Sequence, residues 1–140
     1  MLSQVDSLVA KAVRTRNVHI FIDESGIELD RYDREHIRLA VCGRHYGHNL
    51  TFISQRYTML SPSIREGADW IWIFGSPLED QAEIFSSMGL RAEPVELDRF
   101  EGLLVQSWGK DRIRRFRIDP AKNQLLWCGI EDNMNERKKE

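Results

Sequence analysis

Residues 17–25 read Asn-Val-His-Ile-Phe-Ile-Asp-Glu-Ser, and the predicted architecture is built outward from them. The apolar residues at positions 18–22 predict a buried strand, and the carboxylates of Asp23 and Glu24 come where that strand should end. Because carboxylates are costly to place against an apolar strand, their position indicates a functional role. An acidic strand end followed by a turn is also common in α/β proteins, so a purely structural interpretation stays open.

The composition is that of one globular domain. The chain has 140 residues, of which 41% are hydrophobic and 30% charged, with a mean hydropathy of -0.46 and a net charge of -2. This is enough for one core, and it gives no overall attraction to nucleic acid. No apolar run approaches the ~20 residues that span a bilayer, and residues 1–16 lack the apolar centre of a secretion signal. We therefore expect a cytoplasmic protein, in the host cytoplasm if it is viral, with Cys42 and Cys128 as buried reduced thiols.

Strands alternate with helices over the first two thirds of the chain. The apolar spacing predicts a helix that starts after Asp30 or Asp33 and ends near Gly43, with Ile37, Leu39, Ala40 and Val41 on its buried side. Further helices are expected over residues 2–13, 62–65 and 79–88, and strands over residues 18–22, 49–54 and 70–74. This order predicts an α/β fold, a parallel sheet covered by helices, with residues 70–74 as a central strand.

The pattern changes after residue 100. Apolar residues at 103–105 and 113–118 flank Gly109-Lys110, which predicts a C-terminal β-hairpin, and residues 124–128 predict a further short strand. Residues 131–140 are charged without an apolar face, which indicates a disordered tail. We expect a single α/β domain over residues 1–130, in which residues 90–130 form a β-rich extension.

Polar residues follow the first two predicted strands. Ligands of parallel sheets gather beyond the carboxyl ends of the strands, where Asp23-Glu24 and Gln55-Arg56 should share one edge. Asp23 could hold Mg²⁺ through water, because magnesium prefers oxygen ligands and keeps much of its hydration shell. Glu24 could then act as a general base on a water molecule that Gln55 orients.

These segments resemble the FtsK/HerA-type DNA-pumping ATPases. Residues 18–24 are similar to a Walker B strand, and residues 43–56 are similar to the helix end and sensor strand, which in that family ends in a Gln-Arg pair. Residues 63–71 and the strand after them resemble the short helix and the buried strand that follow the sensor in that family. The resemblance covers about residues 17–89.

The resemblance implies a partial P-loop NTPase fold of the RecA-like, additional-strand type, with residues 1–89 as the Walker B and sensor half. It also implies that Asp23 is the Mg²⁺ residue, Glu24 the catalytic base and Gln55 the sensor. By the same resemblance, the candidates for phosphate contact, or for an arginine finger offered to a neighbouring subunit, are Arg44, Arg56 and Arg65.

The sequence departs from the family at the phosphate-binding loop. The motif G-x-x-x-x-G-K-[ST] is absent from the 140 residues, and Gly109-Lys110 is followed by Asp111 and lacks the preceding glycine. About 17 residues precede the Walker B-like strand, against ~30 for a βαβ unit. We therefore expect ATP and Mg²⁺ to bind only if a missing segment or a partner chain supplies a P-loop. The chain would then be a fragment, a split-gene product or a degenerate relative. Whether it hydrolyses ATP is left open by the sequence.

Other residue groups allow weaker interpretations. Cys42-x-x-His45-x-x-His48 could be a metal site, although a buried thiol with surface imidazoles explains it better. Trp70, Trp72 and Phe74 could stack on bases, although core packing is favoured. The cations of the predicted hairpin could contact a DNA backbone or remain solvated, and they are Arg112, Arg114, Arg115 and Arg117.

Two functions follow from these expectations. The first is part of an ATP-driven DNA translocation or packaging motor, and the second is a non-catalytic interaction module that pairs with another chain. In both cases a half-domain leaves a sheet edge uncovered, so we expect self-association or a partner chain.

Overall fold

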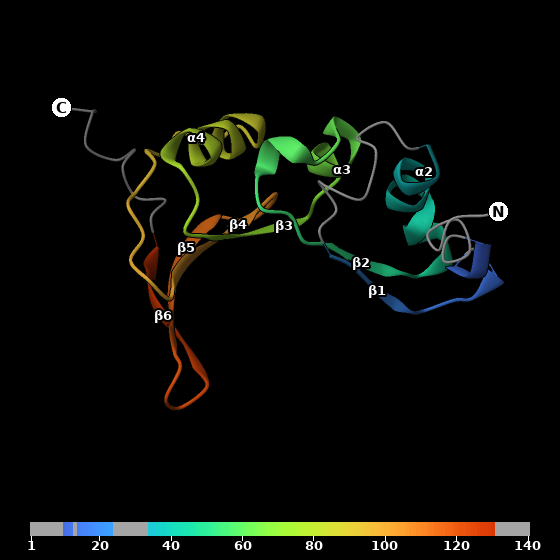
Figure 1. Ribbon diagram of the computed structural model, residues 1–140. Helices are drawn as coiled ribbons and strands as arrows, with labels where there is room; N and C mark the ends of the chain where they lie inside the picture. The colour runs from blue at the N-terminus through green and yellow to red at the C-terminus, as the bar shows by residue number, and fades with distance from the viewer. Residues whose placement is uncertain (1–9, 13, 24–33, 131–140) are drawn as a thin grey trace. The chain divides into compact units, whose positions relative to one another are not determined.

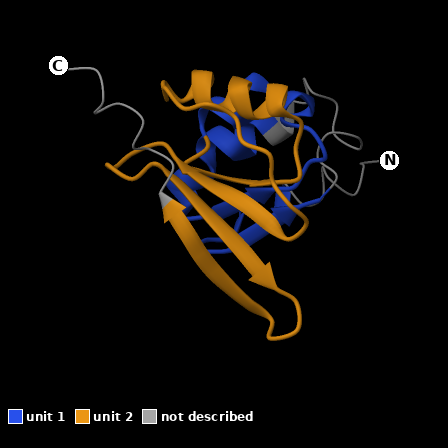
Figure 2. Ribbon diagram, turned by 90° about the vertical axis from the view of Figure 1, so that its left-hand side faces the viewer, with its two compact units in different colours: residues 1–67 blue, residues 68–140 orange. Residues whose placement is uncertain are grey.

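A computed structural model describes residues 10–12, 14–23 and 34–130 of the chain (Figure 1). The chain forms two compact units, Met1–Gly67 and Ala68–Glu140, each with its own sheet (Figure 2). Of the helix expected over residues 2–13, the described residues 10–12 and 14 are helical. Glu24, the expected caps Asp30 and Asp33, and the charged tail lie outside the described residues.

The first unit contains a parallel strand pair. Strand β1 (His19–Ile22) pairs in parallel with β2 (Asn49–Phe52), and the helix α2 (Arg34–Cys42) and the 3-10 helix η1 (Gly43–Tyr46) lie between them in the chain. Ile22 lies opposite Phe52, and the amide of Ile53 donates to the Ile22 carbonyl at 2.8 Å. The βαβ connection predicted for these strands is confirmed.

The core of this unit lies on one face of the strand pair. Ala12, Ile20, Ile22 and Leu39 are buried together, and partly buried Val18, Leu50 and Phe52 pack against them. The prediction of a buried strand holds for only one face of β1, because the side chain of Phe21 is 64% exposed. Alternate residues of a strand point to opposite faces, so Phe21 cannot share the face of Ile20 and Ile22.

Helix α2 also departs from the expected burial at one position. Leu39 is buried, and Ile37 and Ala40 are partly buried, as predicted. Val41 is 59% exposed, so its predicted burial is wrong. Residues two apart on a helix do not face the same way, and Leu39 already occupies the core side.

Two turns in this unit follow the sequence signals. Gly47 closes η1 in the left-handed conformation (φ 73°), and a Cβ there would clash with the Asn17 side-chain oxygen. Glycine is the residue that this conformation favours. After the 3-10 helix η2 (Tyr57–Met59), Ser61 caps the short helix α3 (Pro62–Glu66) by accepting the Ile64 amide at 3.3 Å. The predicted proline-initiated helical turn is confirmed.

The second unit is built on a four-stranded antiparallel sheet. Its strands are β3 (Trp70–Phe74), β4 (Glu101–Gln106), β5 (Ile113–Asp119) and β6 (Gln124–Ile130), in that order across the sheet. The predicted hairpin and final strand are confirmed. The prediction of β3 as a central strand of a parallel sheet is wrong, because β3 lies at the edge of this sheet and pairs antiparallel with β4.

One face of this sheet is covered by helix α4 (Leu78–Ser87), which lies over it in both views (Figures 1 and 2). On the strands, the cross-strand neighbours Ile73 and Leu103, and Val105 and Ile113, are at most 3% exposed. Ile84 and Phe85 of α4 are buried as well. The helix predicted over residues 79–88 is confirmed, and Gly89 follows it in the left-handed conformation (φ 67°).

The two cysteines differ in exposure. Both are free thiols, as predicted, but only Cys42 is partly buried. Cys128 is exposed on β6, where its sulfur donates to the Leu126 carbonyl at 3.6 Å, so the prediction of its burial is wrong. The described residues contain no helix that is both long and apolar enough to cross a membrane.

Candidate functional site

The carboxyl edge of the β1–β2 pair brings two of the predicted residues into one region. Asp23 follows β1 directly, and Gln55 comes after Ile53, whose amide is bound to the last residue of β1. Because β1 and β2 run in parallel and in register, Asp23 and the segment that carries Gln55 leave the sheet at the same edge. Both side chains are exposed there. The predicted base, Glu24, is the next residue after Asp23 and lies outside the described residues.

The segment beyond β2 is held in place by its own hydrogen bonds. The Ser54 hydroxyl donates to the Arg56 carbonyl at 2.9 Å, and the Met59 amide donates to the same oxygen at 3.1 Å. Gln55 lies inside this turn, and both Gln55 and Arg56 are exposed. A carboxylate and an amide side chain at one solvent-facing edge can bind a hydrated cation or a polar ligand.

Arg44 lies at the opposite end of the strand pair. It belongs to η1, which precedes β2, and the carbonyl of Tyr46 in the same helix accepts the Asn17 amide ahead of β1 at 3.0 Å. Strands rise by about 3.3 Å per residue, so the strand length of about 13 Å separates this end from Asp23. The structure therefore does not bring Arg44 to the edge that carries Asp23 and Gln55.

Arg44 and Arg65 are instead found near the end of α3. The Arg44 guanidinium donates to the carbonyl of Gly67, the residue after that helix, at 3.4 Å. Arg65 is in the last turn of α3, and its guanidinium carbon lies 4.9 Å from the centroid of the Tyr57 ring. The predicted arginine set is thus divided between Arg56 at the carboxyl edge and Arg44 and Arg65 at α3.

His48 has a structural role that competes with metal binding. It is buried, its Nε2 lies 2.8 Å from the Ala12 carbonyl oxygen, and its Nδ1 lies 3.4 Å from the Val18 amide. A neutral ring with its proton on Nε2 satisfies both partners, so neither nitrogen has a lone pair left for a metal. Among the described residues, no cluster of three or more His, Cys, Asp or Glu side chains could hold a metal ion. The weaker metal interpretation of Cys42, His45 and His48 is therefore not supported.

The arginines of the β4–β5 hairpin contact groups of their own unit. Arg112 donates to the carbonyls of Met88 at 2.7 Å and Gln106 at 3.1 Å. Arg114 lies over the Trp127 ring, with its guanidinium carbon 4.0 Å from the centroid. Arg115 and Arg117 both form ion pairs with the carboxylate of Glu101. DNA contact by these residues stays a prediction, and each of them also has an intramolecular role.

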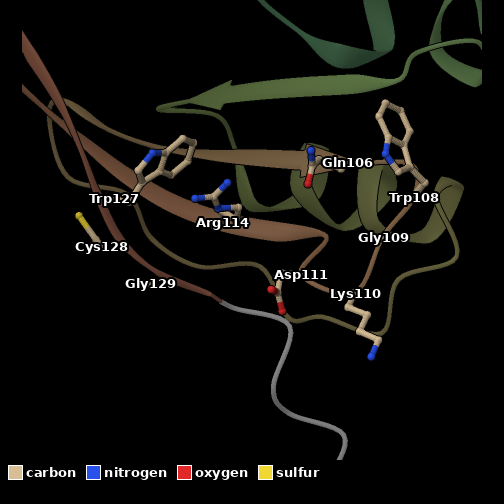
Figure 3. A pocket seen from close by; sticks show the side chains of 9 residues that line it. All are labelled: Gln106, Trp108, Gly109, Lys110, Asp111, Arg114, Trp127, Cys128 and Gly129. Atoms are coloured by element: carbon tan, nitrogen blue, oxygen red, sulfur yellow. The ribbon is translucent and has the colours of Figure 1, made fainter.

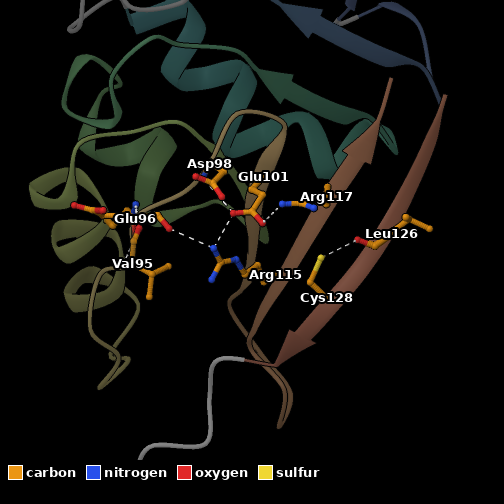
Figure 4. Close-up of polar contacts among 9 residues, drawn as sticks. Val95, Glu96, Asp98, Glu101, Arg115, Arg117, Leu126 and Cys128 are labelled. Carbon is orange, nitrogen blue, oxygen red and sulfur yellow. Dashed lines mark hydrogen bonds and ion pairs between the residues drawn. The ribbon is translucent and has the colours of Figure 1, made fainter. Parts of the chain in front are cut away.

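Glu101 joins β4 to β5 through its carboxylate (Figure 4). It accepts from Arg115 at 2.7 Å, from Arg117 at 3.2 Å and from the Asp98 amide at 3.1 Å, and it is 8% exposed. The hydrogen bond from Arg115 is the main cause that lowers the pKa of Glu101, and the Asp98 amide adds to it. Sequence reasoning missed this residue. The available signal was a lone acid beside an apolar strand, opposite a strand that carries arginine at alternate positions.

The uncovered face of the four-stranded sheet is aromatic. Trp70, Trp72 and Phe74 are 55%, 44% and 53% exposed, so the favoured prediction of core packing for them is wrong. A run that is apolar on both faces need not be covered on both faces. Beside this face, Trp108, Lys110, Asp111, Arg114 and Trp127 line a hollow (Figure 3). Sequence reasoning treated these residues separately, and only strand pairing brings them together.

With both units described, the fold can be compared with known ones. No family model matches the chain, and no curated protein matches it. Among solved structures, the fold resembles part of a viral genome packaging NTPase.

The matching chains include the genome packaging NTPase B204 from Sulfolobus turreted icosahedral virus 2. Its complex with ATP-gammaS matches with a TM-score of 0.53 and 14% sequence identity, over 87% of this chain and 56% of that one. Its complex with AMP matches with a TM-score of 0.52 and 15% identity, over 91% of this chain and 58% of that one. The chain therefore spans just over half the length of the packaging NTPase.

Proposed function

We propose that this chain is part of an ATP-driven DNA translocation or packaging motor, to which it contributes the Walker B and sensor residues. The observation that carries the proposal is the carboxyl edge of the β1–β2 pair, in a fold that resembles part of a packaging NTPase. There, an acid leaves one strand beside a segment that carries an amide side chain, as the sequence resemblance requires of a Walker B strand and its sensor strand.

The roles at this edge follow from the chemistry of the side chains. Asp23 would hold Mg²⁺ through water, because its carboxylate is solvent-exposed and supplies the oxygen ligand that magnesium prefers. Gln55 would orient the attacking water, and Glu24 would accept its proton. Bound ATP would supply the phosphoryl group, and bound Mg²⁺ would neutralise the charge that develops on it. The P-loop motif is absent from this sequence, so the phosphate cradle would come from another segment or chain.

The arginines divide between two tasks. Arg56 follows Gln55 at the carboxyl edge and can contact a phosphate in the same site. Arg44 and Arg65 lie near the end of α3, and Arg44 is at the opposite end of the strands from Asp23. This placement supports a role toward the site of a neighbouring subunit rather than the site of their own chain. Arg112, Arg114, Arg115 and Arg117 remain candidates for DNA contact.

The second candidate function is a non-catalytic interaction module that has kept only this part of the fold. The missing P-loop motif favours it. The two functions differ in whether Glu24 and Gln55 matter for turnover.

The test is ATP hydrolysis, measured as phosphate release with Mg²⁺ and DNA. The full chain is assayed alone and with the product of the neighbouring reading frame, if that frame encodes a P-loop. We expect little turnover by the chain alone and Mg²⁺-dependent turnover by the pair, abolished by Glu24→Gln and strongly reduced by Gln55→Ala. Asn49→Ala, at the other end of β2, is the matched control. Turnover that is unchanged by Glu24→Gln, or a P-loop partner that gives no turnover, would favour the interaction module.

A further inference from the structure

The uncovered face of the four-stranded sheet gathers all 4 tryptophans of the chain. Trp70 and Trp72 lie on β3, Trp127 on β6 and Trp108 in the loop between β4 and β5, and each is 44–55% exposed. Together with Phe74 and Phe116 they form the surface that we call the aromatic face. Phe116 is fully buried at its centre, with the Trp72 and Trp127 rings 5.2 and 6.0 Å away. Large exposed aromatic surface of this kind marks a binding site.

The indole rings of the aromatic face do not stack on one another, and Arg114 covers one face of Trp127. Trp70 and Trp108 have centroids 6.2 Å apart and planes tilted by 32°, and Trp72 and Trp127 have centroids 6.3 Å apart and planes tilted by 35°. Neither pair is stacked, so the indoles do not occupy one another's π-faces. The hollow beside Trp108 and Trp127 is open to solvent and has a volume of about 690 Å³.

The charges at the hollow select the class of ligand. Arg114 lies over Trp127, and the exposed side chains of Lys110 and Asp111 also line the hollow (Figure 3). The centre of a protein interface is generally depleted of lysine and aspartate, whereas single-stranded nucleic acid combines aromatic bases with anionic phosphates that lysine can meet. Exposed indole rings next to cations match that combination.

We propose that the aromatic face binds single-stranded nucleic acid, whose unpaired bases stack on Trp108 and Trp127 and whose phosphates meet Lys110 and Arg114. Duplex DNA keeps its base faces inside its own stack and cannot use the indoles in this way. The proposal shares no residue with the Asp23 edge and does not depend on ATP hydrolysis. Either proposal can fail while the other holds.

The test uses tryptophan fluorescence of the full chain, titrated with a short oligothymidylate, with a duplex of the same length, and with the mononucleotide. We expect the single strand to quench the fluorescence and to bind more tightly than the other two. Trp108→Ala should weaken binding about fivefold or more, because it removes one stacking platform. Phe100→Ala, which changes an exposed aromatic residue outside the aromatic face, should leave the affinity unchanged.

The salt dependence tests the phosphate contact separately. Lys110→Ala should lower the slope of log Kd against log salt concentration by about 0.7, as expected for one lost phosphate contact of a single strand. Lys122→Ala, in the turn between β5 and β6, should not change that slope. The proposal is overturned by any of three results: no binding of the single strand, equal binding of duplex or mononucleotide, or equal effects of the test and control variants.

Discussion

His48 shows at the level of one residue how a motif can have a structural explanation. Its imidazole connects the Ala12 carbonyl of the N-terminal helix to the Val18 amide at the start of the first strand segment. The sequence indicates only that His48 lies three residues after His45, a spacing compatible with a metal site. Burial and two backbone partners change that interpretation, because a ring that is hydrogen-bonded at both nitrogens has no nitrogen left to bind a metal.

We predict that His48→Ala lowers the free energy of unfolding by about 1–3 kcal/mol, since it leaves a buried carbonyl without its donor. Urea unfolding of the full chain measures this change. His45→Ala is the matched control, because His45 is exposed, and it should change the free energy by less than about 0.5 kcal/mol. Equal destabilisation by both variants, or stabilisation of the wild type by zinc that both variants lose, would contradict the structural role.

At the level of the elements, the contact between β4 and β5 depends on the Glu101 carboxylate. Arg117 lies directly opposite Glu101, and Arg115 lies two residues along the same strand. The pKa of Glu101 is lowered in the folded state, so its contribution to stability is present above its ordinary pKa of 4.5 and is lost as the pH falls through the folded value.

We predict that Glu101→Gln destabilises the protein at pH 7 and that its difference from the wild type shrinks as the pH falls below about 4.5, the ordinary pKa of the group. Urea unfolding at a series of pH values measures the difference. Glu93→Gln, which replaces an exposed glutamate of the same unit, is the control for the removal of one negative charge. A constant difference between wild type and Glu101→Gln at all pH values would exclude the ion pairs as its cause.

The elements also show what sequence patterns can predict. Strand positions, the proline-initiated turn and the hairpin follow from local signals, and all were predicted. The partner of β3 was not, because an apolar run such as Trp70–Phe74 has the same pattern in a central parallel strand as in an edge strand with an aromatic face. At the candidate site, the edge shared by Asp23 and Gln55 followed from the parallel order. The position of Arg44 at the opposite end follows from the same order, because η1 precedes β2 in the chain, whereas the hydrogen bond from Arg44 to the Gly67 carbonyl could not be predicted from the sequence.

At the scale of the whole molecule, the parallel sheet is too small to satisfy its own edges. Within the described residues of the first unit, β1 and β2 have only each other as strand partners, and Phe21 exposes 64% of its surface on β1. Unpaired strand edges with apolar side chains promote association.

We therefore predict that the full chain associates with itself or with a partner chain, measured by light scattering at micromolar concentration. Phe21→Lys should reduce self-association, because a charge on an edge strand opposes pairing, whereas Phe100→Lys, outside the strands, should not. A monodisperse monomer that gains no mass from a P-loop partner would contradict the prediction, and it would also weaken the proposal that another chain completes the site.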